Sequence, residues 1–248
     1  MDIIAERKTK TIYKDNDTVV KLFVKDYSKA DILNEALIHA RVEENTNLNI
    51  PKLLEVKKYA SRWAITTEYI EGETLENLMK KHPEKQDEYL EMFVKLQLEM
   101  LSNNVPLLNR VKDKYRRKLT DTSVIDDNTK YELLQRLEGM KNHVKLCHGD
   151  FNLSNVILSP NGKCYILDWS HATQGNASCD AAKTFLIFSL QNKEELANKY
   201  LDMFAKESKI EKSNIQNWIP IVAATQLTYG KSEEEELLRK WIDIVDFQ

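Results

Sequence analysis

The chain has 248 residues, of which 42% are hydrophobic, so it is long enough to bury a substantial core. Its 36 basic and 39 acidic side chains nearly balance, which argues against nucleic acid and membrane surfaces as partners. We expect neither a secretory signal nor a membrane span, because the N-terminus lacks a cationic and then apolar pattern and no run of about 18 apolar residues occurs.

The first strong pattern is a strand followed by a helix. Residues 18–23 are mostly β-branched, aromatic or aliphatic and include one cation, Lys21, as expected for a strand. Apolar residues at helical spacing predict a helix over 28–45, and Glu35 lies in an apolar row of that helix. A carboxylate on an inward row needs a cationic partner, so we predict an ion pair between Lys21 and Glu35. The alternative is a solvated lysine on an edge strand and an unrelated surface glutamate.

Two further strands, 53–59 and 62–67, are separated by the turn Ala60-Ser61. They lead into the segment 68–75, in which Gly72 would relax the turn into the next helix. Read from the residues alone, this segment could be an ordinary loop between a strand and a helix.

From residue 75 onward the periodicity is mainly helical. The expected helices span 75–81, 84–101, 110–119, 128–141, 179–190 and 193–208, with two more between residue 213 and the C-terminus. Ser232 and Glu235 match a capping box that opens the last helix, which would explain the acidic run 233–236. Alternatively, that run contributes to an acidic pocket for a polycation.

The most informative motif is His-Gly-Asp-Phe-Asn-Leu-Ser-Asn at 148–155, followed by Asp168 at the end of an apolar run. Asp150 can orient an attacking hydroxyl group, and the Asn155 amide and the Asp168 carboxylate can hold Mg²⁺. Taken singly, each is more simply a turn or cap residue. Their joint spacing supplies the groups that phosphoryl transfer from ATP requires, and this decides the interpretation.

The spacing also predicts how these groups meet. Residues 156–158 and 163–167 read as two short strands joined by the turn Ser-Pro-Asn-Gly, and such a hairpin returns Asp168 to the neighbourhood of Asn155. Two nearby residues have structural interpretations. His148 would pack and fix the loop backbone, and Asp180 would act at a helix N-terminus or tether the loop.

These motifs resemble a known family. His-Gly-Asp-x-x-x-x-Asn, then Ile-Leu-Asp-Trp at 166–169, then Gly-Asn-x-x-x-Asp-Ala-Ala at 175–182, are similar to the aminoglycoside phosphotransferase and choline kinase group of protein-kinase-like enzymes. Protein kinases more often have His-Arg-Asp and Asp-Phe-Gly, so Gly149 and Trp169 favour a small-molecule kinase.

The resemblance implies an α+β, protein-kinase-like fold with two lobes. Residues 1–70 would form a nucleotide-binding lobe with a small antiparallel sheet and one helix. Residues 71–248 would form a larger, mainly helical lobe with the catalytic loop and the substrate site. By the same resemblance, the Glu68 carbonyl and the Ile70 amide would bind the adenine ring, and Lys21 would organise the triphosphate.

One feature departs from the family pattern. A glycine-rich loop normally covers the phosphates, yet no glycine precedes Gly72. The turn between the first two strands lies near residues 7–11, and we interpret its lysines, Lys8 and Lys10, as solvated turn residues. Loose binding of the phosphates or an unusual nucleotide preference would follow.

We therefore predict a phosphotransferase that uses Mg²⁺ and ATP, with GTP as the alternative nucleotide, to phosphorylate a small hydroxylated molecule. Aminoglycoside-like, choline-like and sugar-like acceptors all remain open, and so does the oligomeric state. A compact atypical protein kinase and a nucleotide-binding pseudokinase are the alternative functions. Three cysteines without metal-ligand spacing favour the cytoplasm. Possible acceptor contacts are Trp218, Tyr229, Trp241, Asp243 and Asp246.

Overall fold

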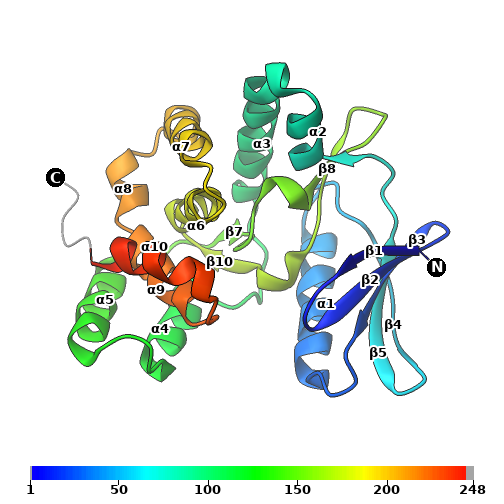
Figure 1. The fold of residues 1–248 in the computed structure, drawn as a ribbon, viewed down its shortest axis with the longest axis horizontal. Helices are drawn as coiled ribbons and strands as arrows, with labels where there is room; N and C mark the ends of the chain where they lie inside the picture. The colour runs from blue at the N-terminus through cyan, green and yellow to red at the C-terminus, as the bar shows by residue number, and fades with distance from the viewer. Residues whose placement is uncertain (1, 244–248) are drawn as a thin grey trace. The chain divides into compact units, whose positions relative to one another are not determined.

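The computed structural model of the protein describes residues 2–243, and Asp246 lies outside this range. The chain forms two compact units (Figure 1). The first contains Met1–Tyr89, Val105–Leu107 and Leu153–His171, and the second contains Leu90–Asn104, Leu108–Asn152 and Ala172–Gln248. The first unit therefore extends past residue 70 and takes in the hairpin that carries Asn155 and Asp168.

A five-stranded antiparallel sheet forms most of the first unit, in the order β1-β2-β3-β5-β4. Its strands are β1 (Asp2–Glu6), β2 (Lys10–Asp15), β3 (Thr18–Phe23), β4 (Leu53–Tyr59) and β5 (Arg62–Glu68). One helix, α1 (Lys29–Asn45), packs against β4 and β5. Its N-cap is Ser28, whose hydroxyl accepts a hydrogen bond from the Asp31 amide at 3.3 Å. Phe23, Ile32 and Ile65 are buried between helix and sheet.

The predicted hairpin completes the first unit. β8 (Val156–Leu158) pairs with β9 (Cys164–Ile166) and with the two-residue strand β6 (Glu73–Thr74), which leads into α2 (Leu75–Lys81). Gly72 precedes β6 with φ +143°, a backbone conformation that favours glycine. A Cβ at this position would lie 2.8 Å from Ile157 Cγ2 and nearer still to the Leu158 carbonyl. The connection therefore needs glycine both for its conformation and for its close approach to β8.

We expect Gly72→Ala to lower the free energy of unfolding by about 2 kcal/mol, because it adds a collision with β8 to an unfavourable φ. Gly162→Ala is the matched control, since Gly162 also has a positive φ (+81°) but nothing within 4 Å of an added Cβ. Urea denaturation of both variants would separate the two contributions. Equal losses in the free energy of unfolding would show that the contact between the added Cβ and β8 is not destabilising.

The second unit is mainly helical, as expected. Its helices are α3 (Gln86–Leu101, which begins in the first unit), α4 (Val111–Asp121), α5 (Asp127–Gly139), α6 (Ala177–Leu190), α7 (Glu194–Ser208), α8 (Lys212–Gln216), α9 (Ile219–Leu227) and α10 (Ser232–Ile242). Two short strands, β7 (Lys145–Cys147) and β10 (Thr173–Gly175), pair beside them. Phe93 centres an aromatic cluster, with its ring 4.4 Å from Phe151 and 5.9 Å from Phe188, measured between centroids. α6 lies in the middle of the unit, against α7 and α9 (Figure 1).

The C-terminal part of the fold differs from the sequence prediction in two respects. The described chain after residue 211 forms three helices rather than two, because α9 starts anew with Pro220 in its first turn, where a missing backbone N–H costs nothing. The predicted capping box is wrong. Ser232 is already helical, Lys231 occupies the N-cap position, and Glu235 pairs instead with Arg239 one turn later at 2.9 Å.

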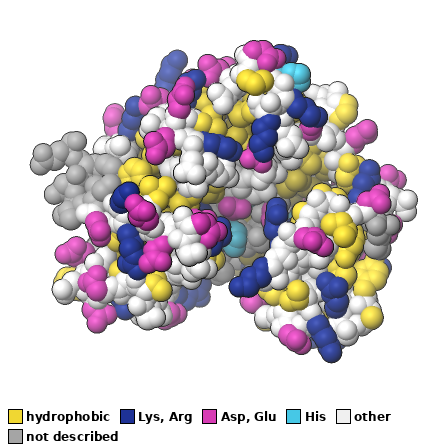
Figure 2. All heavy atoms as spheres, viewed as in Figure 1, with side chains coloured by type: hydrophobic (Ala, Val, Ile, Leu, Met, Phe, Trp, Pro, Cys, Tyr) yellow, Lys and Arg dark blue, Asp and Glu magenta, His cyan; other side chains and the backbone are white. Residues whose placement is uncertain are grey.

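No helix within residues 2–243 is both long and apolar enough to cross a membrane. Acidic and basic side chains are interspersed over the face shown in Figure 2. This distribution agrees with the near balance of charge in the sequence.

Candidate active site

In the first unit, a buried lysine lies between two carboxylates that come from different elements. Lys21 Nζ, on β3, is 3.0 Å from Glu35 Oε1 on α1 and 2.9 Å from Asp168 Oδ1 after β9. Burial by itself would lower the pKa of Lys21, but Asp168 and Glu35 outweigh it and raise that pKa above its usual value. The ion pair expected between Lys21 and Glu35 is thus present, and it includes Asp168 as a third member.

Lys10 also reaches this cluster. Its ammonium group is 3.3 Å from Glu35 Oε1 and 4.0 Å from Asp168 Oδ1, and only 14% of its side chain is exposed. The interpretation of Lys10 as a solvated turn residue is therefore wrong. The reason is register: Lys10 is the first residue of β2 and faces Phe23, which places it on the same side of the sheet as Lys21. Lys10 and the apolar Ile12 are two residues apart and therefore lie on the same face of the strand. This spacing was the sequence signal that could have placed Lys10 on the same side of the sheet as Lys21.

Asn155 and Asp168 lie at the two ends of the hairpin, as the spacing predicts. The Leu167 amide donates to the Asn155 carbonyl at 2.8 Å, and Val156 pairs with Ile166. Asp168 has φ +56°, a conformation uncommon outside glycine, and its side chain is 32% exposed. A carboxylate and an amide oxygen are donor types that suit Mg²⁺, so these two residues fit a magnesium ion.

The segment expected to bind adenine leaves the sheet at the end of β5. The Glu68 amide donates to the Lys52 carbonyl at 2.9 Å, and the Tyr69 amide donates to the Asp17 carbonyl at 2.8 Å. Ile70 follows without regular secondary structure, just before Gly72. These bonds fix the start of the segment to the residues that precede β4 and β3.

Asp150 belongs to the second unit, where a buried carboxylate holds its loop. The Gly149 amide donates to Asp180 Oδ1 at 2.8 Å, and Gly149 has φ +77°. Asp180 is 2% exposed, and its other oxygen accepts from Gln97 Nε2 at 3.0 Å. Burial raises the pKa of Asp180, and the bonds from Gly149 and Gln97 act against this shift. Asp180 thus tethers the loop and lies in the first turn of α6, in line with its structural interpretation.

Further contacts fix the same loop. Tyr200 donates its hydroxyl to Gln97 Oε1 at 2.7 Å, which orients the amide that holds Asp180. His148 is fully buried, and its Nδ1 accepts from the Asp150 amide at 3.3 Å. The Asn152 side chain donates to the Asp150 carbonyl at 2.9 Å. The backbone on both sides of Asp150 is therefore held, and a fixed backbone limits where the carboxylate can point.

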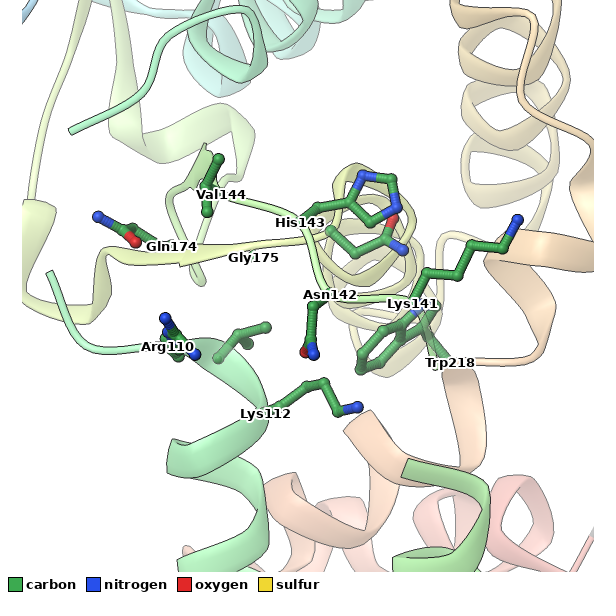
Figure 3. A pocket seen from close by; sticks show the side chains of 11 residues that line it. Arg110, Lys112, Lys141, Asn142, His143, Val144, Gln174, Gly175 and Trp218 are labelled. Carbon is green, nitrogen blue, oxygen red and sulfur yellow. The ribbon is translucent and has the colours of Figure 1, made fainter. Parts of the chain in front are cut away.

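A cavity of about 100 Å³ also lies in the second unit, near the start of α4 (Figure 3). Arg110, Lys112, His143 and Trp218 are among the residues that line it. Lys112 donates hydrogen bonds to the carbonyls of Glu138 and Met140, so its ammonium group has a structural role. Trp218 is one of the possible acceptor contacts, but none of the predicted catalytic, nucleotide-binding or metal-binding residues lines this cavity. The predicted site residues instead form one cluster around Lys21 in the first unit and another around Asp150 in the second unit.

Comparison with known proteins decides the family. A family model described as the phosphotransferase enzyme family matches residues 6–211. The chain belongs to this family. The resemblance drawn from the sequence motifs is thereby confirmed, and the chain is a member of a phosphotransferase family. No curated protein sequence matches it.

The phosphotransferase is also similar to solved structures, at low identity. Aminoglycoside phosphotransferase APH(4)-Ia is 16% identical with a TM-score of 0.73, and the match covers 98% of this chain and 91% of that one. A thermostable mutant of that enzyme, in ternary complex with AMP-PNP and hygromycin B, is 15% identical with a TM-score of 0.71, covering 98% and 91%. ADP-bound APH(2'')-Ib is 18% identical with a TM-score of 0.62, covering 97% and 89%. These matches confirm the α+β, protein-kinase-like fold.

Proposed function

We propose that this phosphotransferase uses Mg²⁺ and ATP to phosphorylate a hydroxyl group of a small molecule. The observation that carries the proposal is the cluster of Lys21, Glu35 and Asp168. A buried ammonium group held by two carboxylates is a fixed positive charge, and phosphoryl transfer needs such a charge against the triphosphate. The bound AMP-PNP of one solved relative supports a nucleotide as the donor.

Residues 1–70 would supply the nucleotide-binding lobe, with Lys21 on the phosphates and Glu35 holding Lys21 in place. The Glu68 carbonyl and the Ile70 amide would bind the adenine edge. Asn155 and Asp168 would hold Mg²⁺, which offsets the negative charge of the phosphates. Lys10 adds a second cation beside Glu35 and could take part of the role of the missing glycine-rich loop.

Residues 71–248 would supply the catalytic loop and the acceptor site. Asp150 would orient the acceptor hydroxyl and take its proton as the oxygen attacks phosphorus. The bonds from Gly149 to Asp180 and from Asn152 to the Asp150 carbonyl hold the loop, so the carboxylate needs little reorganisation during the reaction.

The test is an assay of nucleotide turnover with and without acceptors. Release of ADP from Mg·ATP would be followed with neutral sugars, sugar phosphates, choline and aminoglycosides, and with GTP in place of ATP. We expect at least one acceptor to raise the rate above that with water alone, and the rate to require a divalent cation. A chain that binds nucleotide but transfers phosphate to no acceptor would instead favour the pseudokinase alternative.

The metal site gives a prediction that does not depend on the acceptor. We expect Mg²⁺ to strengthen AMP-PNP binding to the wild type and to have little effect on Asp168→Ala, because the ion loses its carboxylate ligand. Calorimetric titrations with and without Mg²⁺ would measure this difference. Asp26→Ala, which removes an exposed carboxylate from the same unit, is the control and should keep the full magnesium effect. A magnesium effect that persists in Asp168→Ala would contradict the assignment.

A further inference from the structure

Three lysines of the second unit lie on the helices near the loop that carries Asp150. That loop is tied to α6, where Asp180 accepts a hydrogen bond from the Gly149 amide at 2.8 Å, one turn before Lys183. Lys114 and Lys118 are four residues apart on α4, so they share one face of that helix, and Lys183 lies on α6. Both helices pack against α9 (Figure 1). All three lysine side chains are half-buried. Two helices of the second unit thus contribute positively charged side chains to the same region of that unit.

Two of the ammonium groups reach the C-terminal end of α9. Lys118 Nζ lies 3.8 Å from the centre of the Tyr229 ring. Lys183 Nζ donates a hydrogen bond to Gln226 Oε1. A tyrosine ring and a glutamine amide orient a cation but carry no net charge, so these contacts do not neutralise the lysines. Both cations are therefore held in position with their charge intact.

Electrostatic coupling links two of these lysines, Lys114 and Lys183, to Asp150. Burial, with repulsion from Lys118 and Lys183, lowers the pKa of Lys114 to about 8. Burial also lowers the pKa of Lys118 and that of Lys183 to about 8. Asp150 acts in the opposite direction on Lys114 and Lys183, since a nearby anion stabilises an ammonium group. At pH 7 the three lysines are thus mainly protonated, and Asp150 acts on two of them.

Most of the acidic run of α10 is paired with cations of its own, although Glu234 also acts on Lys183 and opposes the lowering of its pKa by burial. The pairs are Lys231–Glu234 at 2.6 Å, Arg239–Glu235 at 2.9 Å and Lys240–Glu236 at 2.9 Å. Gln226 Nε2 also donates to Glu234 Oε2 at 2.7 Å. Each of these three glutamates therefore has a cation of its own. The alternative reading of the run, as an acidic pocket for a polycation, loses its support.

We infer that the acceptor carries a phosphate or carboxylate group, which Lys118 and Lys183 bind beside Asp150. This inference rests on the proposed function, because that function assigns Asp150 to the acceptor hydroxyl. An anionic group gains charge-assisted hydrogen bonds from the two lysines. A polycation such as an aminoglycoside meets repulsion from all three ammonium groups.

The proposed transfer forms one bond to phosphorus and breaks another. The acceptor hydroxyl oxygen bonds to the γ-phosphorus of ATP, and the bond from that phosphorus to the β-phosphate oxygen breaks. Asp150 takes the hydroxyl proton, and ADP leaves. The product keeps its original anionic group and gains a phosphate ester. The lysines offset the acceptor charge that the triphosphate would otherwise repel.

Inorganic phosphate is the first probe, titrated calorimetrically into the full chain saturated with Mg·AMP-PNP at constant ionic strength. We expect one phosphate to bind, and Lys118→Gln and Lys183→Gln each to weaken its binding about tenfold, the scale of one lost charge-assisted bond. Lys199→Gln on α7 removes the same charge from an exposed lysine and should bind phosphate as the wild type does. Circular dichroism would check that each variant folds.

Two results would overturn the inference: no saturable phosphate binding to the wild type, or equal affinity in the wild type and both lysine variants. Because this readout needs no turnover, it is independent of the proposed function. Phosphate bound at the lysines without transfer to any acceptor would support the anion site and contradict the kinase assignment.

Paired acceptors give the second readout. Glucose, gluconate and glucose 6-phosphate share a hydroxylated chain and differ in their anionic group, as do glycerol, glycerate and glycerol 3-phosphate. We expect a higher kcat/KM for an anionic member than for its neutral partner, and Lys183→Gln to remove the advantage by raising the KM for the acceptor but not for ATP. Comparison of carboxylate and phosphate members identifies the anionic group. Efficient turnover of hygromycin B or choline would overturn the inference.

Discussion

Asp150→Asn is expected to lower kcat by about two to four orders of magnitude, the usual scale for a positioned proton acceptor. The amide keeps the size and most hydrogen-bonding capacity of the carboxylate but cannot take the hydroxyl proton. The loop should remain in place, because Gly149 and Asn152 hold it through backbone atoms that the substitution leaves unchanged. Single-turnover kinetics with Mg·ATP would measure the chemical step directly.

Two further measurements make this prediction specific. AMP-PNP affinity should equal that of the wild type, because the residues proposed to bind nucleotide belong to the first unit. Asp127→Asn on α5 removes a carboxylate that is 98% exposed and should leave kcat unchanged. A kcat for Asp150→Asn close to the wild-type value would remove Asp150 from the chemistry.

Substitution of Lys21 or Glu35 by alanine is expected to raise the KM for ATP and to lower kcat. The two residues are 3.0 Å apart and act as one unit, so the double variant should cost clearly less than the sum of the single variants. Lys21→Ala should have the larger effect, since it removes the charge that contacts both Glu35 and Asp168.

A double-mutant cycle in kcat/KM for ATP tests this coupling, and Lys10 provides the internal comparison. Lys10 also contacts Glu35, but at 3.3 Å and with a longer approach to Asp168, so we expect Lys10→Ala to have a smaller effect on kcat. Small, strictly additive effects of Lys21 and Glu35 would mean that the nucleotide half of the site is wrongly assigned. The assignment of Asp150 would survive that result.

Much of the fold could be read from local patterns. Residues 18–23, 53–59 and 75–81 form the predicted elements with the same bounds, because alternation in a strand and helical periodicity are properties of short segments. The motif at 148–155 and Asp168 indicated phosphoryl transfer for the same reason. The chemistry needs particular residue types at a fixed spacing, and a hairpin short enough to be recognised connects Asn155 to Asp168.

The sequence by itself therefore determined the element types, the family and the candidate catalytic residues. Only the tertiary structure decided which distant side chains meet. Lys10 joins Glu35 across 25 residues, Gln97 reaches Asp180 across 83, and Tyr200 reaches Gln97 across 103. The lysines of α4 and α6 belong to one cluster for the same reason, since both helices pack on α9. Such contacts depend on how whole elements pack, and no local periodicity encodes that packing.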